Sequence, residues 1–223
     1  LTVGTLYCFN WTNSAAISIK SSATSSNTGT VTTPTSAPAD IDTSSYATAS
    51  ISDDQVVVTA SVPSVFSFAL SGNTDPLGLL STSSVTSSPT PRTATVNTNA
   101  KNGWSVWAKD SSTGLFSATA SETIDSTTPG TNSTLVAGTT GYNTGVTTSQ
   151  VDGSGTITVA APFVGTAAGQ GGGLDTALRS LASSNGTANT AVLTIKNNVA
   201  IDPTVPAAAD YTDTITIIGA GLF

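Results

Sequence analysis

Hydrophobic and polar residues alternate in short runs along the chain, and clusters of Gly, Pro, Asn, Asp and Ser separate the runs. Long helical periodicity is missing, so the pattern predicts an all-β protein. The expected strands are residues 1–9, 15–20, 55–62, 65–70, 92–97, 103–109, 115–119, 156–160, 191–196 and 211–218. Short strands in this number fit an antiparallel β-sandwich, either one large sandwich or two small ones.

The clearest local signal lies in residues 92–109, where two β runs flank Asn102-Gly103. Asn-Gly favours a two-residue turn, which predicts a hairpin, and a second turn before Leu115 would extend it to a three-stranded meander. Trp104 and Trp107 differ by three positions and therefore point to opposite faces of a strand. We expect one of these two tryptophans in the core and the other as a candidate surface aromatic.

One short helix is expected at residues 174–181, because Leu174, Leu178 and Leu181 follow the i, i+4, i+7 spacing of a helix face. At about two turns such a helix would be a connector.

The chain divides into three parts by composition. Residues 21–50 are crowded with Ser and Thr and are interrupted by Pro34 and Pro38, which predicts a linker or a long surface loop. This linker would separate an N-terminal β arm, residues 1–20, from a β-sandwich body, residues 51–223. A split of the body into two domains would fall near residue 140, in the Gly- and Thr-rich stretch 138–145.

Composition places the protein outside the cell. The 223 residues contain no methionine, so we expect that a leader upstream of Leu1 has been removed, as in secreted proteins. Charged residues make up 9% of the chain, against about 25% in typical soluble domains. The single cysteine, Cys8, lies in an apolar stretch and is expected to be buried, with a disulfide to another chain as the alternative. The predicted localisation is secreted or at the cell surface.

The charge pattern limits the partners. The formal net charge is −7, and the six Lys and Arg residues are scattered along the chain. Nucleic acid needs a clustered basic surface, so we expect no nucleic-acid partner. No apolar run approaches the roughly 20 residues of a membrane span, so none is expected in the mature chain.

The residue types that most catalytic and metal sites require are largely missing. The chain has no histidine, which removes Ser-His-Asp and histidine–metal constellations. The acid pairs Asp40/Asp42, Asp53/Asp54 and Asp210/Asp213 lie at turn-like positions, so we expect no enzyme. Residues 152–155 or 40–42 could contribute oxygen ligands to Ca²⁺, but no calcium site is assigned and no cofactor is expected.

Three Asn-X-Ser/Thr sequons, at Asn10, Asn132 and Asn185, are candidate N-glycosylation sites. Asn132 and Asn185 lie in loop-like sequence, which makes them the better candidates of the three.

Two stretches resemble known surface proteins. Asn102-Gly-Trp-Ser-Val106, together with the terminal Tyr211-Thr-Asp-Thr-Ile-Thr-Ile217, is similar to secreted bacterial β-sandwich proteins of the WxL kind, although Val106 stands where that family has Leu. Residues 58–72 are similar to repetitive surface proteins of candidate-phylum bacteria and to donor-strand fibre or pilus subunits. The resemblance implies an extracellular β-sandwich and an association with cell walls, and it carries over no binding residue.

These observations predict a structural subunit of an extracellular, pilus-like or matrix filament. An apolar arm that pairs with the sheet edge of a neighbour, repeated head to tail, gives a homopolymer. Pairing of the arm within its own chain is the alternative. The candidate arm residues are Val3, Leu6, Tyr7, Phe9, Trp11, Ile17 and Ile19. A surface-layer protein or a module that binds glycan or cell wall is the alternative function, with Trp104 or Trp107 stacking on sugar.

Overall fold

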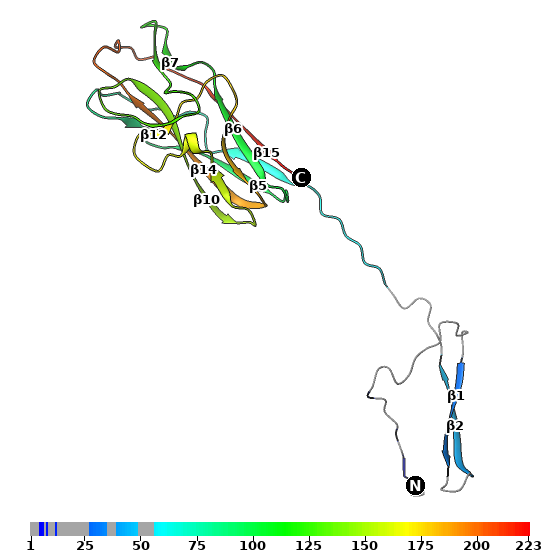
Figure 1. Ribbon diagram of the computed structural model, residues 1–223. Coiled ribbons are helices and arrows are strands. Elements are labelled where there is room, and N and C mark those ends of the chain that lie inside the picture. Colours follow the sequence, from blue (N-terminus) through cyan, green and yellow to red (C-terminus); the bar gives the residue numbers. More distant parts are fainter. Residues whose placement is uncertain (1–4, 7, 9–11, 13–26, 35–38, 49–55) are drawn as a thin grey trace. The chain divides into compact units, whose positions relative to one another are not determined.

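The structure is a computed structural model that describes residues 5, 6, 8, 12, 27–34, 39–48 and 56–223. It divides into two compact units, Leu1–Ser61 and Val62–Phe223. Its described residues contain strands and one 3-10 turn, η1 (Ala161–Phe163), and no α-helix, so the prediction of an all-β fold is confirmed (Figure 1).

The first unit contains a β-hairpin in the region predicted to be a linker or loop. Strand β1 (Asn27–Pro34) pairs antiparallel with β2 (Asp40–Thr48). The prediction for residues 21–50 was therefore wrong for these two ranges. The β-branched threonines that gave the segment its low-complexity appearance also favour strands, and Thr43 donates a hydrogen bond to Thr32 across the pair.

The second unit is a sandwich of two antiparallel sheets, and Val62–Phe223 forms one compact unit. The first sheet has the order β3-β5-β14-β10-β12-β9, with β4 beside β14, and the second sheet has the order β11-β13-β6-β15. The strands of the first sheet are β3 (Phe66–Leu70), β4 (Thr86–Ser87), β5 (Arg92–Thr98), β9 (Asn132–Thr134), β10 (Gly141–Asp152), β12 (Gln170–Gly172) and β14 (Ala188–Ala200). Those of the second sheet are β6 (Trp104–Asp110), β11 (Ile157–Val159), β13 (Arg179–Ser184) and β15 (Ile215–Gly221).

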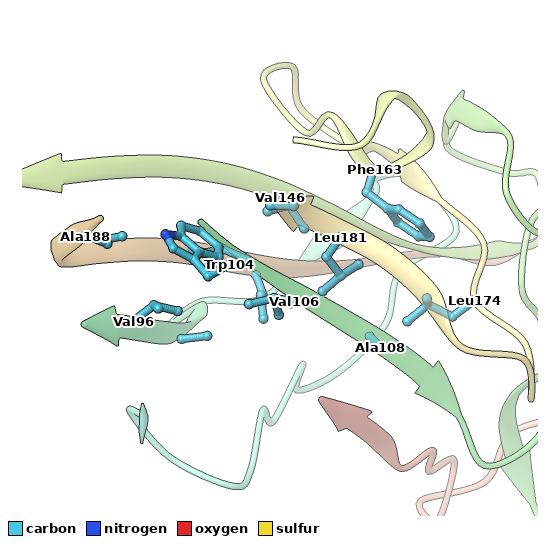
Figure 2. Packing of buried hydrophobic residues seen from close by; sticks show 14 residues of the cluster. Val96, Trp104, Val106, Ala108, Val146, Phe163, Leu174, Leu181 and Ala188 are labelled. Carbon is cyan, nitrogen blue, oxygen red and sulfur yellow. The ribbon is translucent and has the colours of Figure 1, made fainter. Parts of the chain in front are cut away.

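The core lies between the two sheets. Figure 2 shows Trp104, Val106 and Ala108 of β6 among Val96 of β5 and Val146 of β10, all fully or almost fully buried. Each strand contributes alternate residues to this core, as its period of two requires. A smaller cluster around Leu115, Ile124, Tyr142 and Val199 includes the hairpin of β7 (Gly114–Ser117) and β8 (Glu122–Asp125).

The predicted hairpin at residues 92–109 was wrong because its two strands lie in different sheets. β5 pairs with β3 and β14, and β6 pairs with β13 and β15. Both strands bury every second residue, and they bring these buried faces together across the core. The Asn102-Gly103 turn, with φ of 93° at Gly103, therefore connects the two sheets. The meander was also wrong, since β7 pairs with β8.

The predicted helix at residues 174–181 was wrong, and strand β13 occupies its end. Leu174 and Leu181 are both buried in the core cluster, but Leu178 between them is exposed. The helical spacing of the three leucines was coincidental. The domain break near residue 140 was also misplaced, because β10 begins at Gly141 and pairs along its length with β14.

Candidate functional site

Residues 56–62, which we call the valine segment, expose a continuous apolar surface. Val56, Val57, Val58 and Val62 are 83–87% exposed, and the segment belongs to no strand, contrary to the prediction for residues 55–62. Figure 1 shows it as an extended chain that leads to β3. Its sequence has a high β-propensity, but the described part of the chain offers it no partner strand. Three consecutive exposed valines, with a fourth at residue 62, are typical of an interaction surface rather than of an ordinary loop.

The alternation within the valine segment matches a strand with one apolar face. In an extended chain, residues two apart share a face. One face would carry the apolar side chains of Val56, Val58, Ala60 and Val62. The other would carry Val57, Thr59 and Ser61.

Asn99 fixes the point at which the valine segment joins the sandwich. Its side-chain amide donates a hydrogen bond to the carbonyl of Pro63 at 2.8 Å, and its side-chain oxygen accepts one from the backbone N–H of Val65, also at 2.8 Å. The hydroxyl of Thr98 donates to the carbonyl of Val65. The chain is therefore held at residues 63–65, immediately after the valine segment.

The predicted N-terminal arm lies largely outside the described residues. Of its candidate residues the structure describes Leu6, which is exposed and lies in no strand. The others, Val3, Tyr7, Phe9, Trp11, Ile17 and Ile19, are outside the described part. Cys8 is exposed, so the expectation that it is buried was wrong.

One edge of the sandwich is incompletely covered. Inward-facing residues of the inner strands, such as Val96 and Val106, are fully buried. At the edge formed by β3 and β15, the inward-facing residues are half-buried or exposed, and we call this group the apolar seam: Phe66, Phe68, Leu70, Ile215 and Ile217. Leu70 is 43% exposed although it lies opposite the buried Ala94.

The two predicted surface aromatics lie on opposite faces of β6. Trp104 is fully buried, so it is the core residue of the pair, and Trp107 is half-buried on the outward face. Ser105, two positions from Trp107 on the same face, helps to line a shallow polar hollow with Asn102, Thr156, Thr158, Ser183, Ser184, Asn185 and Leu222. Hydroxyl and amide groups are of the kind that hydrogen-bond sugar hydroxyls, and Trp107 is not among the residues that line the hollow.

The structure separates the three sequons. Asn10 lies outside the described residues. Asn132 is in β9, where its amide nitrogen donates hydrogen bonds to the carbonyls of Pro162 (2.9 Å) and Val164 (2.8 Å) and its oxygen accepts one from Gln170. Asn185 is exposed, and its side-chain oxygen accepts from the Thr156 N–H. The amide nitrogen is the atom that glycosylation modifies, so Asn185 is the better of the two described sites.

Buried acids form a cluster that the sequence did not reveal. Asp110 at the end of β6 is 1% exposed, and burial, followed by the charge of Asp213, raises its pKa from 3.8 to about 8. Burial, with Asp213 as the next cause, also raises the pKa of Tyr142. One carboxyl oxygen of Asp110 and one of Asp213 are buried and accept no hydrogen bond from the described residues.

The acid pair Asp210/Asp213 does not act as a unit. Asp210 accepts hydrogen bonds from the Ser117 hydroxyl and from the backbone and side chain of Thr119, which lower its pKa to about 2. Asp213 instead accepts from Ser111 and from the N–H of Thr214. Among the described residues, no group of three or more acidic or cysteine side chains could hold a metal ion.

Comparison with protein-family models, curated proteins and solved structures gives no match. Within the described residues, no helix is long and apolar enough to cross a membrane.

Proposed function

We propose that this protein is an extracellular structural subunit that assembles head to tail by donating an extended strand to a neighbouring copy. The observation that supports this most is the exposure of the valine segment, in which four valines are 83–87% exposed. Burying such side chains is worth about 1.5–3 kcal/mol each, so an exposed β-prone segment gains free energy when it finds a sheet edge. We therefore propose residues 56–62 as the donated strand.

Strand donation between copies gives an open assembly. The valine segment and the sandwich belong to the same chain, so each copy carries both the donated strand and an accepting edge. Contacts between two different surfaces do not close on themselves in general and give a filament. An export route and a surface location agree with the low charge of the chain and remain part of the proposal.

A pair of substitutions tests the donation. Val58→Asp places a charge on the apolar face of the segment, and Thr59→Asp places the same charge on the opposite face. Both positions are exposed, so neither variant disturbs the core. By light scattering of the full chain, Val58→Asp is expected to reduce polymer at least tenfold, whereas Thr59→Asp retains it. Equal assembly of both variants and the unsubstituted chain would contradict strand donation by this segment.

A second candidate function, glycan or cell-wall binding, is favoured by the polar hollow on the outward face of the second sheet. Trp107 lies on the same face as Ser105, one of the residues lining the hollow. Titration with soluble cell-wall and polysaccharide fragments should quench Trp107 fluorescence if sugars stack there. A Trp107→Ala chain that binds these fragments as well as the unsubstituted chain would exclude this role for Trp107.

A further inference from the structure

Strand β15 presents an open backbone edge. Thr214 accepts a hydrogen bond from the N–H of Ser111, and Leu222 donates one to Gly103, on the β6 side. N–H and C=O of one residue in an antiparallel strand point to the same side, and the side alternates along the chain. The even-numbered residues therefore face β6. The backbone N–H and C=O groups of the odd-numbered residues face away from β6. These residues are Ile215, Ile217, Gly219 and Gly221.

The same edge is apolar and uncharged. Side chains of Ile215 and Ile217 point inward, because they lie opposite the buried Asp110 and Ala108, yet both are half-buried. Across the sandwich, the rings of Phe68 and Phe66 lie against Gly219 and Gly221, where a Cβ would be 2.6 and 3.0 Å from them. An additional strand beside β15 would cover the open side of the apolar seam.

We propose that residues 56–62 of a second copy pair with the open edge of β15 and cover its apolar seam. This inference rests on the proposed function, and it names the accepting surface. The valine segment has seven residues, as does β15, so the two match in length. Its face of Val56, Val58, Ala60 and Val62 would meet the apolar seam, and its other face would meet solvent.

The other sheet edges fit less well. Strands β9 and β11 have three residues each, and short edge strands are a common protection against pairing. β3 has five residues, of which Phe66, Phe68 and Leu70 direct backbone groups outward. β15 offers four such residues, which makes it the longest open edge in the described sandwich.

Charge does not oppose the contact between copies. The chain carries a net charge of −7, so two copies repel each other at long range. However, the sequence contains no charged residue between Gln55 and Thr74 or between Thr214 and Phe223. The donated strand and the accepting edge are therefore both free of charged side chains.

Photo-cross-linking in the full chain tests this pairing. Benzoylphenylalanine replaces Val57, which would point outward beside β15, and unlabelled chains are mixed with ¹⁵N-labelled chains. After irradiation, mass spectrometry is expected to find cross-links from residue 57 to residues 214–223 of the other isotope. Cross-links to β9 or β11, or cross-links within one copy alone, would overturn the proposed acceptor.

A substitution pair gives a second readout. Leu70→Asp places a charge at the end of the apolar seam, and Ala69→Asp places it on the outward face of the same strand; both positions are exposed. Leu70→Asp is expected to lower polymer at least tenfold, and Ala69→Asp is not. Suppose that Val58→Asp blocks assembly, Leu70→Asp does not, and the cross-links lie outside residues 214–223. The proposed accepting edge, β15, is then wrong, whereas strand donation by residues 56–62 is retained. If no polymer forms under any condition, both proposals fail.

Discussion

The carboxyl group of Asp110, buried at the end of β6, lies close to that of Asp213, whose negative charge helps to raise the pKa of Asp110. Burial and the nearby negative charge both favour the protonated form of Asp110. Burial and this charge raise the pKa of Asp110 to about 8, with Asp175 adding to the effect and Tyr142 nearby. Because the pKa of Asp110 in the unfolded chain is near 3.8, the folded protein retains a proton that the unfolded chain loses between these two pH values.

Stability is therefore expected to decrease with rising pH. The contribution of this proton is fully present below pH 3.8 and is lost as the pH rises through about 8. Urea unfolding followed by Trp104 fluorescence should show a lower midpoint at pH 9 than at pH 5. Asp110→Asn removes this titrating group and should flatten the dependence. Asp125→Asn, at an exposed position, serves as the control, and an unchanged slope for Asp110→Asn would count against the raised pKa of Asp110.

Asp210 is expected to make stability increase with rising pH, opposite to the effect of Asp110. The Ser117 hydroxyl and the Thr119 groups lower its pKa to about 2, so its stabilising effect is present above pH 3.8 and is lost as the pH falls through about 2. Asp210→Ala should lower the urea midpoint at pH 7 and leave it nearly unchanged at pH 2. Ser117→Ala should also lower the urea midpoint at pH 7, because it removes the hydroxyl that donates a hydrogen bond to Asp210. A midpoint for Asp210→Ala that equals the unsubstituted value at pH 7 would refute this role.

The close packing of Phe68 on Gly219 predicts an unusual cost for adding a side chain. Valine normally favours strands, yet a Cβ at residue 219 would lie 2.6 Å from the Phe68 ring. Gly219→Val is expected to destabilise by about 1–3 kcal/mol, as overpacking does. Ala220→Val, on the outward face of β15, should change the free energy of unfolding far less. Equal effects of the two substitutions, measured by urea unfolding, would show that the Phe68 contact is unimportant.

The sequons are expected to differ in modification. In a host that glycosylates Asn-X-Ser/Thr, peptide mapping of folded, secreted protein should find sugar on Asn185 and not on Asn132. The Asn132 amide holds the carbonyls of Pro162 and Val164, which a sugar on that nitrogen would displace. Asn132→Ala should lower the free energy of unfolding by about 1–3 kcal/mol, because it leaves the carbonyls of Pro162 and Val164 without their hydrogen bonds. Folded protein with sugar at Asn132 would contradict this reading of the hydrogen bonds.

The alternating pattern of the sequence predicted six of the eleven strands of the two sheets, β3, β5, β6, β11, β14 and β15, in which inward and outward residues alternate. It failed for β10, whose Gly, Asn and Thr residues read as a loop. Burial of Asn143 and Thr144 there is offset by hydrogen bonds to Asn198 and Asn197, and a single sequence does not show such partners. The predicted pairing of β5 with β6 was wrong, because the residues of a turn do not determine in which sheet the following strand lies.

The sites were harder to predict than the strands. Asp110 could have been found, since Trp104, Val106, Ala108 and Asp110 share one face of a strand and three of them are apolar. The paired glycines 219 and 221 in a β run are a further signal of close packing. The valine segment was predicted as a strand from its propensity. Propensity alone does not tell whether a partner strand belongs to the same chain or to another copy.

Negative-stain electron microscopy of the full chain, beside its size-exclusion profile over a range of concentrations, tests strand donation most directly. Uniform thin filaments that disappear in the Val58→Asp variant and persist in Thr59→Asp are the predicted result. A monodisperse monomer at every concentration would contradict the account.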